Sequence, residues 1–128
     1  LLFCNMKSLA ATTHLRPFIP AKDFAVSRAF YKDLGAKELW TSDDMVLLEL
    51  GDSQFYLQDA YVKAWAENTM LFLNVPELEQ CWDELQALDL VNRYPGIRWK
   101  KPTDYDWGLR EIHLIDPAGV LWHFAKAL

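Results

Sequence analysis

The sequence has no long apolar run and very few cysteines. No stretch approaches the ~20 consecutive apolar residues that a membrane-spanning helix requires, so a membrane protein is not expected. Of its two cysteines, Cys4 lies in an irregular stretch and Cys81 falls on the predicted apolar face of a helix, which argues against a disulfide. The apolar run before Cys4 is too short for a signal peptide. These absences favour a cytoplasmic protein with reduced thiols and an irregular leader over residues 1–13.

The sequence is also poor in basic clusters. Its formal net charge is -5 and its pI about 5.1, and no Lys/Arg run is longer than the pair Lys100 and Lys101. It therefore has no electrostatic means of gripping a phosphate backbone, so nucleic acid is not expected as a partner, whereas a cationic ligand would be favoured. Hydrophobic residues make up 52% of the 128 residues and include six tryptophans, which argues against disorder and fits one domain with its own core.

The first half of the chain is predicted to contain one helix and four strands. Asp23 can cap a helix over residues 23–35, in which apolar residues recur at helical spacing, and Gly35 can adopt the left-handed conformation that ends it. The strands are predicted by apolar runs between turn residues. They cover residues 15–20, 36–42, 45–50 and 53–60. The element order is βαβββ.

The second half repeats that order. A strand is predicted over residues 69–75, and a helix over residues 76–88 opens with Pro76 and two glutamates, which suit a first helical turn. A short strand near residues 91–94, a loop through Trp107 and a final hairpin follow. The repeat is one of element order, because sequence identity between the halves is faint.

The two modules are expected to form one α+β domain over residues 14–126. They cover residues 14–60 and 69–126, with a linker over residues 61–68. The expected architecture is a curved mixed sheet with helices on its outer face. Trp65 in the linker is a candidate dimer contact or cleft wall, whereas Trp40 and Trp82 are expected in the core.

The final hairpin carries two of the three histidines. Its turn is Asp116-Pro117-Ala118-Gly119. With the turn centred near Ala118, His113 lies roughly opposite His123, and cross-strand neighbours share a face of the sheet. One face then carries Glu111, His113, His123 and Ala125, while the other carries Ile112, Leu114, Val120, Trp122 and Phe124. The apolar face is expected to pack on the helices and the polar face to line a cavity.

This combination of modules and motif resembles the vicinal oxygen chelate superfamily, which includes glyoxalase I, extradiol dioxygenases, fosfomycin-resistance enzymes and bleomycin-resistance proteins. The resemblance covers residues 15 to 126, including the opening PFIPAKDFAVSRAFYKDLG. Its most specific part is WG-x-RE-x5-DPAG-x3-HF, here Trp107, Gly108, Arg110, Glu111, Asp116 to Gly119, His123 and Phe124. That motif is most similar to the bleomycin-resistance proteins, which implies antibiotic binding in a metal-free cavity of a dimer.

The metal site of the superfamily's enzymes is broken in this sequence. The resemblance places ligand positions at Arg16 and Met70 on the first strand of each module and at His123 on the last strand. Arginine cannot coordinate a cation, and methionine is a poor ligand for hard divalent metals. His14 could replace Arg16 in a shifted alignment without repairing Met70. No metal or other cofactor is therefore expected, although Glu111, His113 and His123 remain an alternative two-His, one-carboxylate group.

The candidate binding residues are polar and aromatic side chains of the predicted cavity. Trp107 and Tyr105, with Trp99 and the carboxylates of Asp104 and Asp106, could either anchor a loop or bind a planar or cationic compound. Cys81 is not expected to be a nucleophile, because its helix position indicates the core. The complete ligand-binding prediction is Arg16, Phe18, Tyr56, Gln58, Trp65, Phe72, Tyr105, Trp107, Glu111, His113 and His123.

The favoured function is binding without chemical change. The chain is expected to be a homodimer that sequesters an aromatic or cationic small molecule in a cleft at or near the subunit interface, with no catalytic residue. The first alternative is a divergent metal-dependent lyase, transferase or dioxygenase of the same fold. The second is a module that binds a protein partner through exposed aromatic side chains. Metal analysis separates the enzyme from the small-molecule binding protein. Ligand-induced quenching of tryptophan fluorescence separates the small-molecule binding protein from the module that binds a protein partner.

Overall fold

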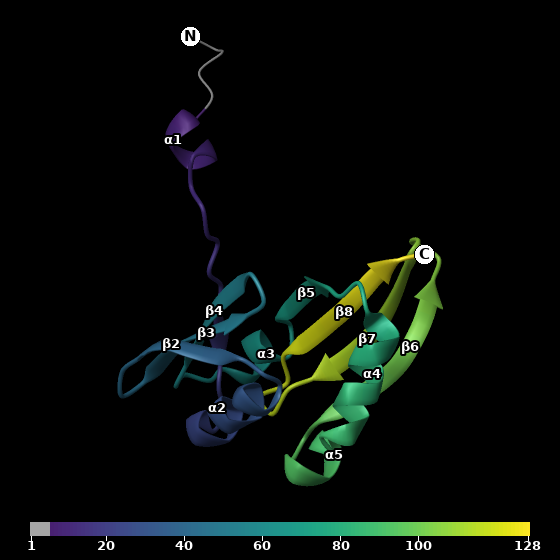
Figure 1. Cartoon of the computed structure of the whole chain (residues 1–128). Helices are drawn as coiled ribbons and strands as arrows, with labels where there is room; N and C mark the ends of the chain where they lie inside the picture. The colour runs from purple at the N-terminus through teal and green to yellow at the C-terminus, as the bar shows by residue number, and fades with distance from the viewer. Residues whose placement is uncertain (1–5) are drawn as a thin grey trace.

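A computed structural model describes residues 6–128 (Figure 1). The expectation for Cys4 lies outside these residues. The first module consists of β1 (Phe18–Pro20), α2 (Phe24–Asp33), β2 (Lys37–Thr41), β3 (Met45–Leu50) and β4 (Ser53–Gln58). Its strands form a mixed sheet in the order β1-β4-β3-β2, in which β1 is parallel to β4. The predicted cap of α2 is confirmed, because the Asp23 carboxylate accepts the Val26 N–H at 3.2 Å.

The second module follows the same plan with one additional helix. It consists of β5 (Met70–Asn74), α4 (Leu78–Ala87), α5 (Leu90–Arg93), β6 (Arg98–Tyr105), β7 (Leu109–Ile115) and β8 (Leu121–Ala127). Its strand order is β5-β8-β7-β6, with β5 parallel to β8. The α+β fold is confirmed, but the strands form two separate four-stranded sheets, not one continuous curved sheet.

The strand predicted near residues 91–94 is wrong. These residues belong largely to α5, which follows Asp89 in the left-handed conformation at φ 54 and fully buries Leu90. The third strand of the module is β6, which occupies much of the segment predicted as a loop. The periodicity of so short an apolar stretch cannot distinguish a strand from one helical turn. Burial of Leu90 in the core favours the helical turn.

The core lies where both helices cover the apolar faces of the sheets. Figure 1 shows α2 against the sheet of the first module and α4 against the sheet of the second. Tyr31 of α2 packs edge-on against Phe55 of β4 at 5.3 Å between ring centroids, and Phe55 contacts Trp122 of β8 at 5.4 Å. Aromatic packing therefore joins the two modules.

A buried hydrogen-bonded chain reinforces this junction. The Tyr31 hydroxyl donates to the Asp116 carboxylate and accepts the Trp122 indole N–H at 2.9 Å. Burial raises the pKa of the Tyr31 hydroxyl, and the adjacent Asp116 carboxylate raises it further. Asp116 also accepts the backbone N–H groups of Ala118 and Val120 at 2.8 and 3.0 Å, so the same carboxylate shapes the final turn.

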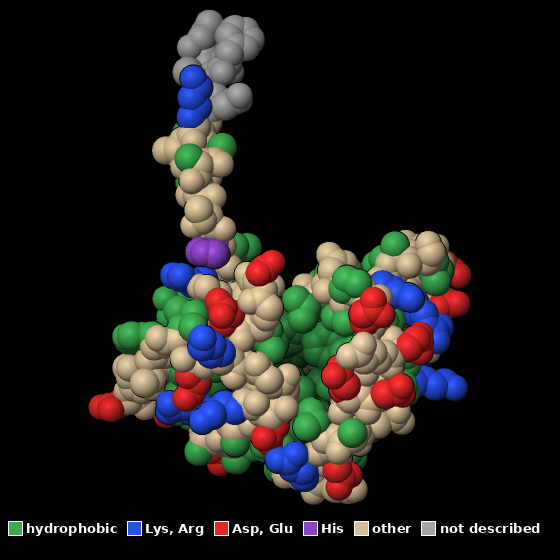
Figure 2. Space-filling view, in the orientation of Figure 1, with side chains coloured by type: hydrophobic (Ala, Val, Ile, Leu, Met, Phe, Trp, Pro, Cys, Tyr) green, Lys and Arg blue, Asp and Glu red, His purple; other side chains and the backbone are tan. Residues whose placement is uncertain are grey.

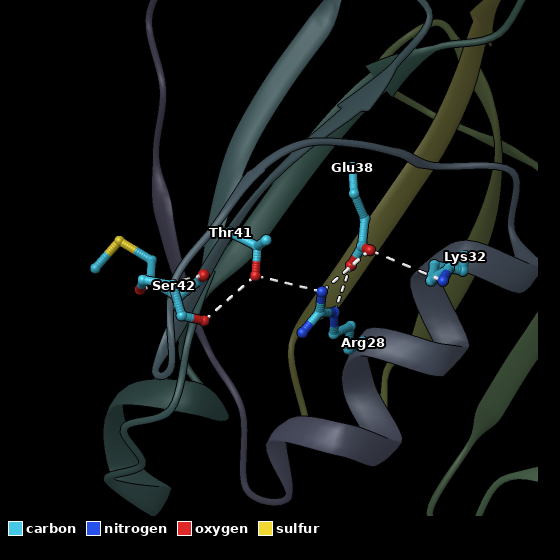
Figure 3. Close-up of polar contacts among 6 residues, drawn as sticks. Arg28, Lys32, Glu38, Thr41 and Ser42 are labelled. Atoms are coloured by element: carbon cyan, nitrogen blue, oxygen red, sulfur yellow. Dashed lines mark hydrogen bonds and ion pairs between the residues drawn. The ribbon is translucent and has the colours of Figure 1, made fainter.

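An ion pair holds α2 to the edge strand β2 (Figure 3). The Arg28 guanidinium bonds both oxygens of Glu38 and also donates to the Thr41 hydroxyl at 3.3 Å. Lys32 approaches Glu38 at 3.8 Å. The Arg28 hydrogen bond lowers the pKa of Glu38. The pair is partly open to solvent, so we assign it a positioning role and little net stabilisation.

Two short helices lie outside the modules. α1 (Lys7–Ala10) is part of the segment expected to be an irregular leader; it buries no residue and extends away from the body of the protein (Figure 1). α3 (Lys63–Ala66) lies in the linker and buries Ala66. Among the described helices, none has the length and apolar character needed to cross a membrane.

Candidate functional site

The final hairpin adopts the predicted register. His113 pairs with His123 and Glu111 with Ala125 in the antiparallel β7–β8 ladder, so these side chains share the face opposite the core. Gly119 has φ +98, where side chains are strained, and a Cβ there would lie 3.2 Å from the Glu67 side chain. The glycine therefore allows the turn that fixes the register, and the predicted alternation is confirmed.

Glu111 is the centre of a hydrogen-bonded cluster. Its carboxylate is only 3% exposed and accepts the Trp107 indole N–H at 2.7 Å. One carboxylate oxygen, Oε1, lies 2.9 Å from His113 Nε2 and 2.7 Å from His123 Nδ1. Burial raises the pKa of Glu111, but the hydrogen bonds from His123, Trp107 and His113 outweigh it and lower the pKa to about 2. Glu111 is thus a buried carboxylate that stays ionised.

Aromatic rings extend this cluster across the sheet. Tyr105 stacks on Trp107 at 4.5 Å and on His113 at 5.4 Å between ring centroids. Phe72 of β5 is the register partner of His123 and is 52% exposed, and Trp107 is 62% exposed. We call this surface, made of Phe72, Tyr105, Trp107, Glu111, His113 and His123, the second-sheet face. It brings together six of the predicted ligand-binding residues, among them Glu111, whose carboxylate is held by three hydrogen bonds.

The charge around this face differs from the expectation. Asp104, expected to attract a cation, bonds Arg110 at 2.8 Å on the opposite side of the sheet, where Arg110 also contacts α4. A depression of about 290 Å³ beside His113 is lined instead by Arg98 and Lys100. Lys100 lies 5.2 Å from the Tyr105 ring centroid. The local charges therefore favour a cationic ligand less than the overall charge suggests.

A second group of predicted residues lies on the first sheet. Phe18 and Tyr56 are register partners and stack at 4.7 Å between ring centroids. The prediction that Trp40 lies in the core is wrong. Its side chain lies on this open face and is 50% exposed, with 6.4 Å between its ring centroid and that of Tyr56. Its strand partner is Leu47, which in turn pairs with Tyr56, so the row faces away from α2. We call Phe18, Trp40, Leu47 and Tyr56 the first-sheet face.

The remaining predicted residues are not gathered into either cluster. Arg16 donates to the Gln54 side chain at 2.7 Å, and Gln58 pairs with Met45 at the end of β4. Trp65 on α3 is 74% exposed, and its role as a dimer contact or cleft wall stays a prediction. Trp82, expected in the core, is only partly buried and packs on Trp99 at 5.2 Å.

Cys81 has the environment of a structural thiol. It is half-buried on α4 among hydrophobic neighbours. Burial raises the pKa of its thiol, with a smaller contribution from Glu84. A raised pKa reduces the thiolate fraction and with it the nucleophilicity of the sulfur.

Sequence reasoning missed a cleft between the modules. It measures about 360 Å³ and lies where Figure 2 shows a recess lined by hydrophobic side chains. Phe55, Leu71 and Trp122 contribute apolar walls, and His14 lies at its rim. Only Phe72 among the predicted ligand-binding residues reaches it. No sequence motif marks this cleft, because its walls come from strands of both modules that the pattern assigns simply to the core.

The metal positions implied by the family resemblance do not fit a metal. Arg16 is engaged with Gln54, and the register partner of His123 is Phe72, whereas Met70 pairs with Leu121. Neither Phe72 nor Met70 suits a hard divalent cation. The alternative group, Glu111, His113 and His123, has suitable donor types, with ligand atoms within 4.8 Å of one another. Two ligand atoms bound to one ion are at most about 4.2 Å apart, since each bond is about 2.1 Å. These three side chains could hold a metal only with all their ligand atoms within that shorter separation.

Comparison with solved structures gives the same fold. A bleomycin-binding protein in complex with bleomycin has a TM-score of 0.78 at 22% identity, covering 91% of this chain and 100% of that chain. A bleomycin resistance determinant encoded on transposon Tn5 also has a TM-score of 0.78, at 21% identity, with 91% and 98% coverage. A manganese-bound fosfomycin resistance protein from Listeria monocytogenes has a TM-score of 0.69 at 14% identity, with 91% coverage of each chain.

A family-level match spans most of the sequence. A comparison with curated proteins finds no match. Residues 11–124 match the family model of the Glyoxalase/Bleomycin resistance protein/Dioxygenase superfamily. The matched residues include both modules and the strands that carry Glu111, His113 and His123. The chain belongs to the glyoxalase/bleomycin resistance protein/dioxygenase superfamily.

Proposed function

We propose that this protein binds an aromatic small molecule on the second-sheet face and releases it unchanged. The observation that carries the proposal is the fixed cluster of Glu111, His113 and His123 beside the exposed stack of Tyr105 and Trp107. Binding sites combine an apolar or aromatic wall with a few convergent polar groups, and this face has both. The buried carboxylate holds the imidazoles in place before a ligand arrives, which reduces the entropy lost on binding.

We propose further that two copies associate so that the face of one is closed by the other. Each chain exposes a second aromatic surface, the first-sheet face, in which Phe18 and Trp40 are about half exposed. Exposed apolar patches of this kind mark binding or association surfaces. A homodimer would convert an open sheet face into a cleft. Light scattering at micromolar concentration should give twice the chain mass of 14.9 kDa, and a monomer would contradict the dimer.

Bleomycin is the first compound to test, because a structural neighbour was solved with it. Titration calorimetry with metal-free bleomycin should give saturable binding, and the fluorescence of Trp107 should be quenched in parallel. Trp65, which is exposed on α3 outside the second-sheet face, provides the control: Trp65→Phe should retain the quenching and Trp107→Phe should lose most of it. Retention of the full signal in Trp107→Phe would contradict the placement of the site.

A metal-dependent enzyme is the second candidate, favoured by the Glu111, His113 and His123 group. In a two-His, one-carboxylate site, the bound ion would supply Lewis-acid chemistry at open coordination positions. The existing hydrogen bonds argue for the binding protein, since both carboxylate oxygens already have donors. Metal content of protein purified without chelator decides between them. One tightly held divalent ion per chain would favour the enzyme.

A further inference from the structure

The edge strand β6 places two basic side chains beside the second-sheet face. Arg98 pairs with Ile115, and Lys100 pairs with His113. Cross-strand partners share a face of the sheet, so both basic side chains lie on the open face. They line the depression of about 290 Å³ beside His113, together with Leu121, the register partner of Ile115 on β8. This depression, which we call the β6 depression, combines two cationic groups with an aliphatic floor.

A bulge in β6 determines which charges lie on the open face. Between Lys100 and Thr103, β6 has one residue more than its partner strand β7. The extra residue reverses the alternation of side chains beyond it. Tyr105 therefore lies on the open face with Lys100, whereas Asp104 lies on the opposite face and bonds Arg110. Without the bulge, the Asp104 carboxylate would lie on the open face and offset the two basic groups.

Neither basic side chain is neutralised by a described residue. Arg98 is the one arginine of five that forms neither an ion pair nor a side-chain hydrogen bond within residues 6–128. The Lys100 ammonium lies 5.2 Å from the Tyr105 ring centroid and forms no ion pair in that part of the chain. Glu111, the acidic residue of the second-sheet face, is only 3% exposed, and both its oxygens accept hydrogen bonds. In a chain with a formal net charge of -5, the β6 depression is thus a local positive surface.

We infer that the β6 depression binds the carboxylate of a planar aromatic acid. The inference rests on the proposed function, because the ring of the acid would occupy the second-sheet face. The planar guanidinium of Arg98 can donate two parallel hydrogen bonds to a carboxylate, and Lys100 adds a second cation. The ring would lie on Ile115 and Leu121, which are half-buried. A volume of about 290 Å³ is at the lower end of the range for ligand pockets, which favours an acid with one or two rings.

Two probes that share one ring system test the preference for an acid. They are naphthalene-2-carboxylate and the neutral naphthalene-2-carboxamide, each titrated into the full chain at pH 8 and followed by backbone ¹H–¹⁵N spectra. Naphthalene-2-carboxylate should shift the amide resonances of Arg98, Ile115 and Leu121. It should also bind at least about tenfold more tightly than the carboxamide, a ratio that one charge-assisted hydrogen bond supplies.

Substitution of each basic residue tests whether it holds the carboxylate. Arg98→Gln and Lys100→Gln should each reduce the preference for naphthalene-2-carboxylate toward unity, because each removes one of the two cations. Lys37→Gln is the matched control, since it removes the same charge from an exposed position on β2 of the first sheet and should leave the preference unchanged. All three side chains are exposed, so the variants should fold, and thermal melts check this.

The outcomes separate this inference from the proposed function. Equal binding of both probes on the second-sheet face would overturn the preference for an acid and leave the proposed aromatic site intact. A preference that survives in both Arg98→Gln and Lys100→Gln would do the same. Displacement of naphthalene-2-carboxylate by equimolar inorganic phosphate would also overturn the inference, because the depression would then bind anions that have no ring. Failure of both probes to bind at millimolar concentration would overturn it too, whereas the bleomycin titration with Trp107→Phe would still decide the proposed function.

Discussion

Removal of the charge on Glu111 should change how the stability of the protein depends on acid. In the folded state the pKa of Glu111 falls from 4.5 to about 2, because hydrogen bonds to the ionised form outweigh burial. One pKa unit is about 1.36 kcal/mol, so the ionised, bonded carboxylate contributes about 3 kcal/mol. The folded pKa is depressed, so this contribution is complete above pH 4.5 and is lost as the pH falls toward about 2. Glu111→Gln should therefore cost about 3 kcal/mol at pH 7 and almost nothing at pH 2.

The assay is urea unfolding followed by tryptophan fluorescence at a series of pH values from 7 to 2. Protein concentration is held constant, because dimerisation would make the apparent stability depend on it. Glu79→Gln is the matched control, since Glu79 bonds Arg110 on the exposed surface of α4 and should give only a small, nearly constant difference. A difference between wild type and Glu111→Gln that stays constant from pH 7 to pH 2 would refute the argument that the three hydrogen bonds favour the ionised carboxylate.

Four further outcomes are expected. Tyr31→Phe should destabilise the fold by about 1–3 kcal/mol in thermal or urea unfolding, because it leaves the buried Asp116 carboxylate and the Trp122 indole without their shared partner; an unchanged midpoint would contradict a role in stability. Trp107→Ala should weaken ligand binding at least about tenfold in calorimetry, and unaltered affinity in a folded variant would move the site elsewhere. Trp82→Ala should destabilise by about 2–4 kcal/mol, near the lower end for a tryptophan because the side chain is only partly buried, while ligand affinity stays unchanged. Dialysis against chelator should leave the melting temperature unchanged, since a tightly bound ion would add stability with the logarithm of its saturation; a lower melting temperature would favour the metal-dependent alternative.

Local sequence signals predicted most of the elements correctly. The helix capped by Asp23 and the strand over residues 45–50 agree with α2 and β3 because caps, turns and alternation act within a few residues. The segment after α4 was assigned wrongly, since the helical turn α5 is stabilised by burial of Leu90 against distant residues. Trp40 was misplaced for a related reason: composition favours burial of a tryptophan, whereas the pairing of β2 with β3 decides which face it occupies.

By itself, the sequence determined that His113 and His123 face each other. A four-residue turn with glycine at a left-handed position fixes the register of a hairpin, and strand alternation then places Glu111 on the same face. Only the tertiary structure showed that the three side chains bond one another, that Trp107 reaches back to the same carboxylate, and that Asp104 faces the other way. Hydrogen bonds depend on side-chain rotamers and on distances of a few tenths of an ångström, and these follow from packing between strands that no pattern along the chain encodes.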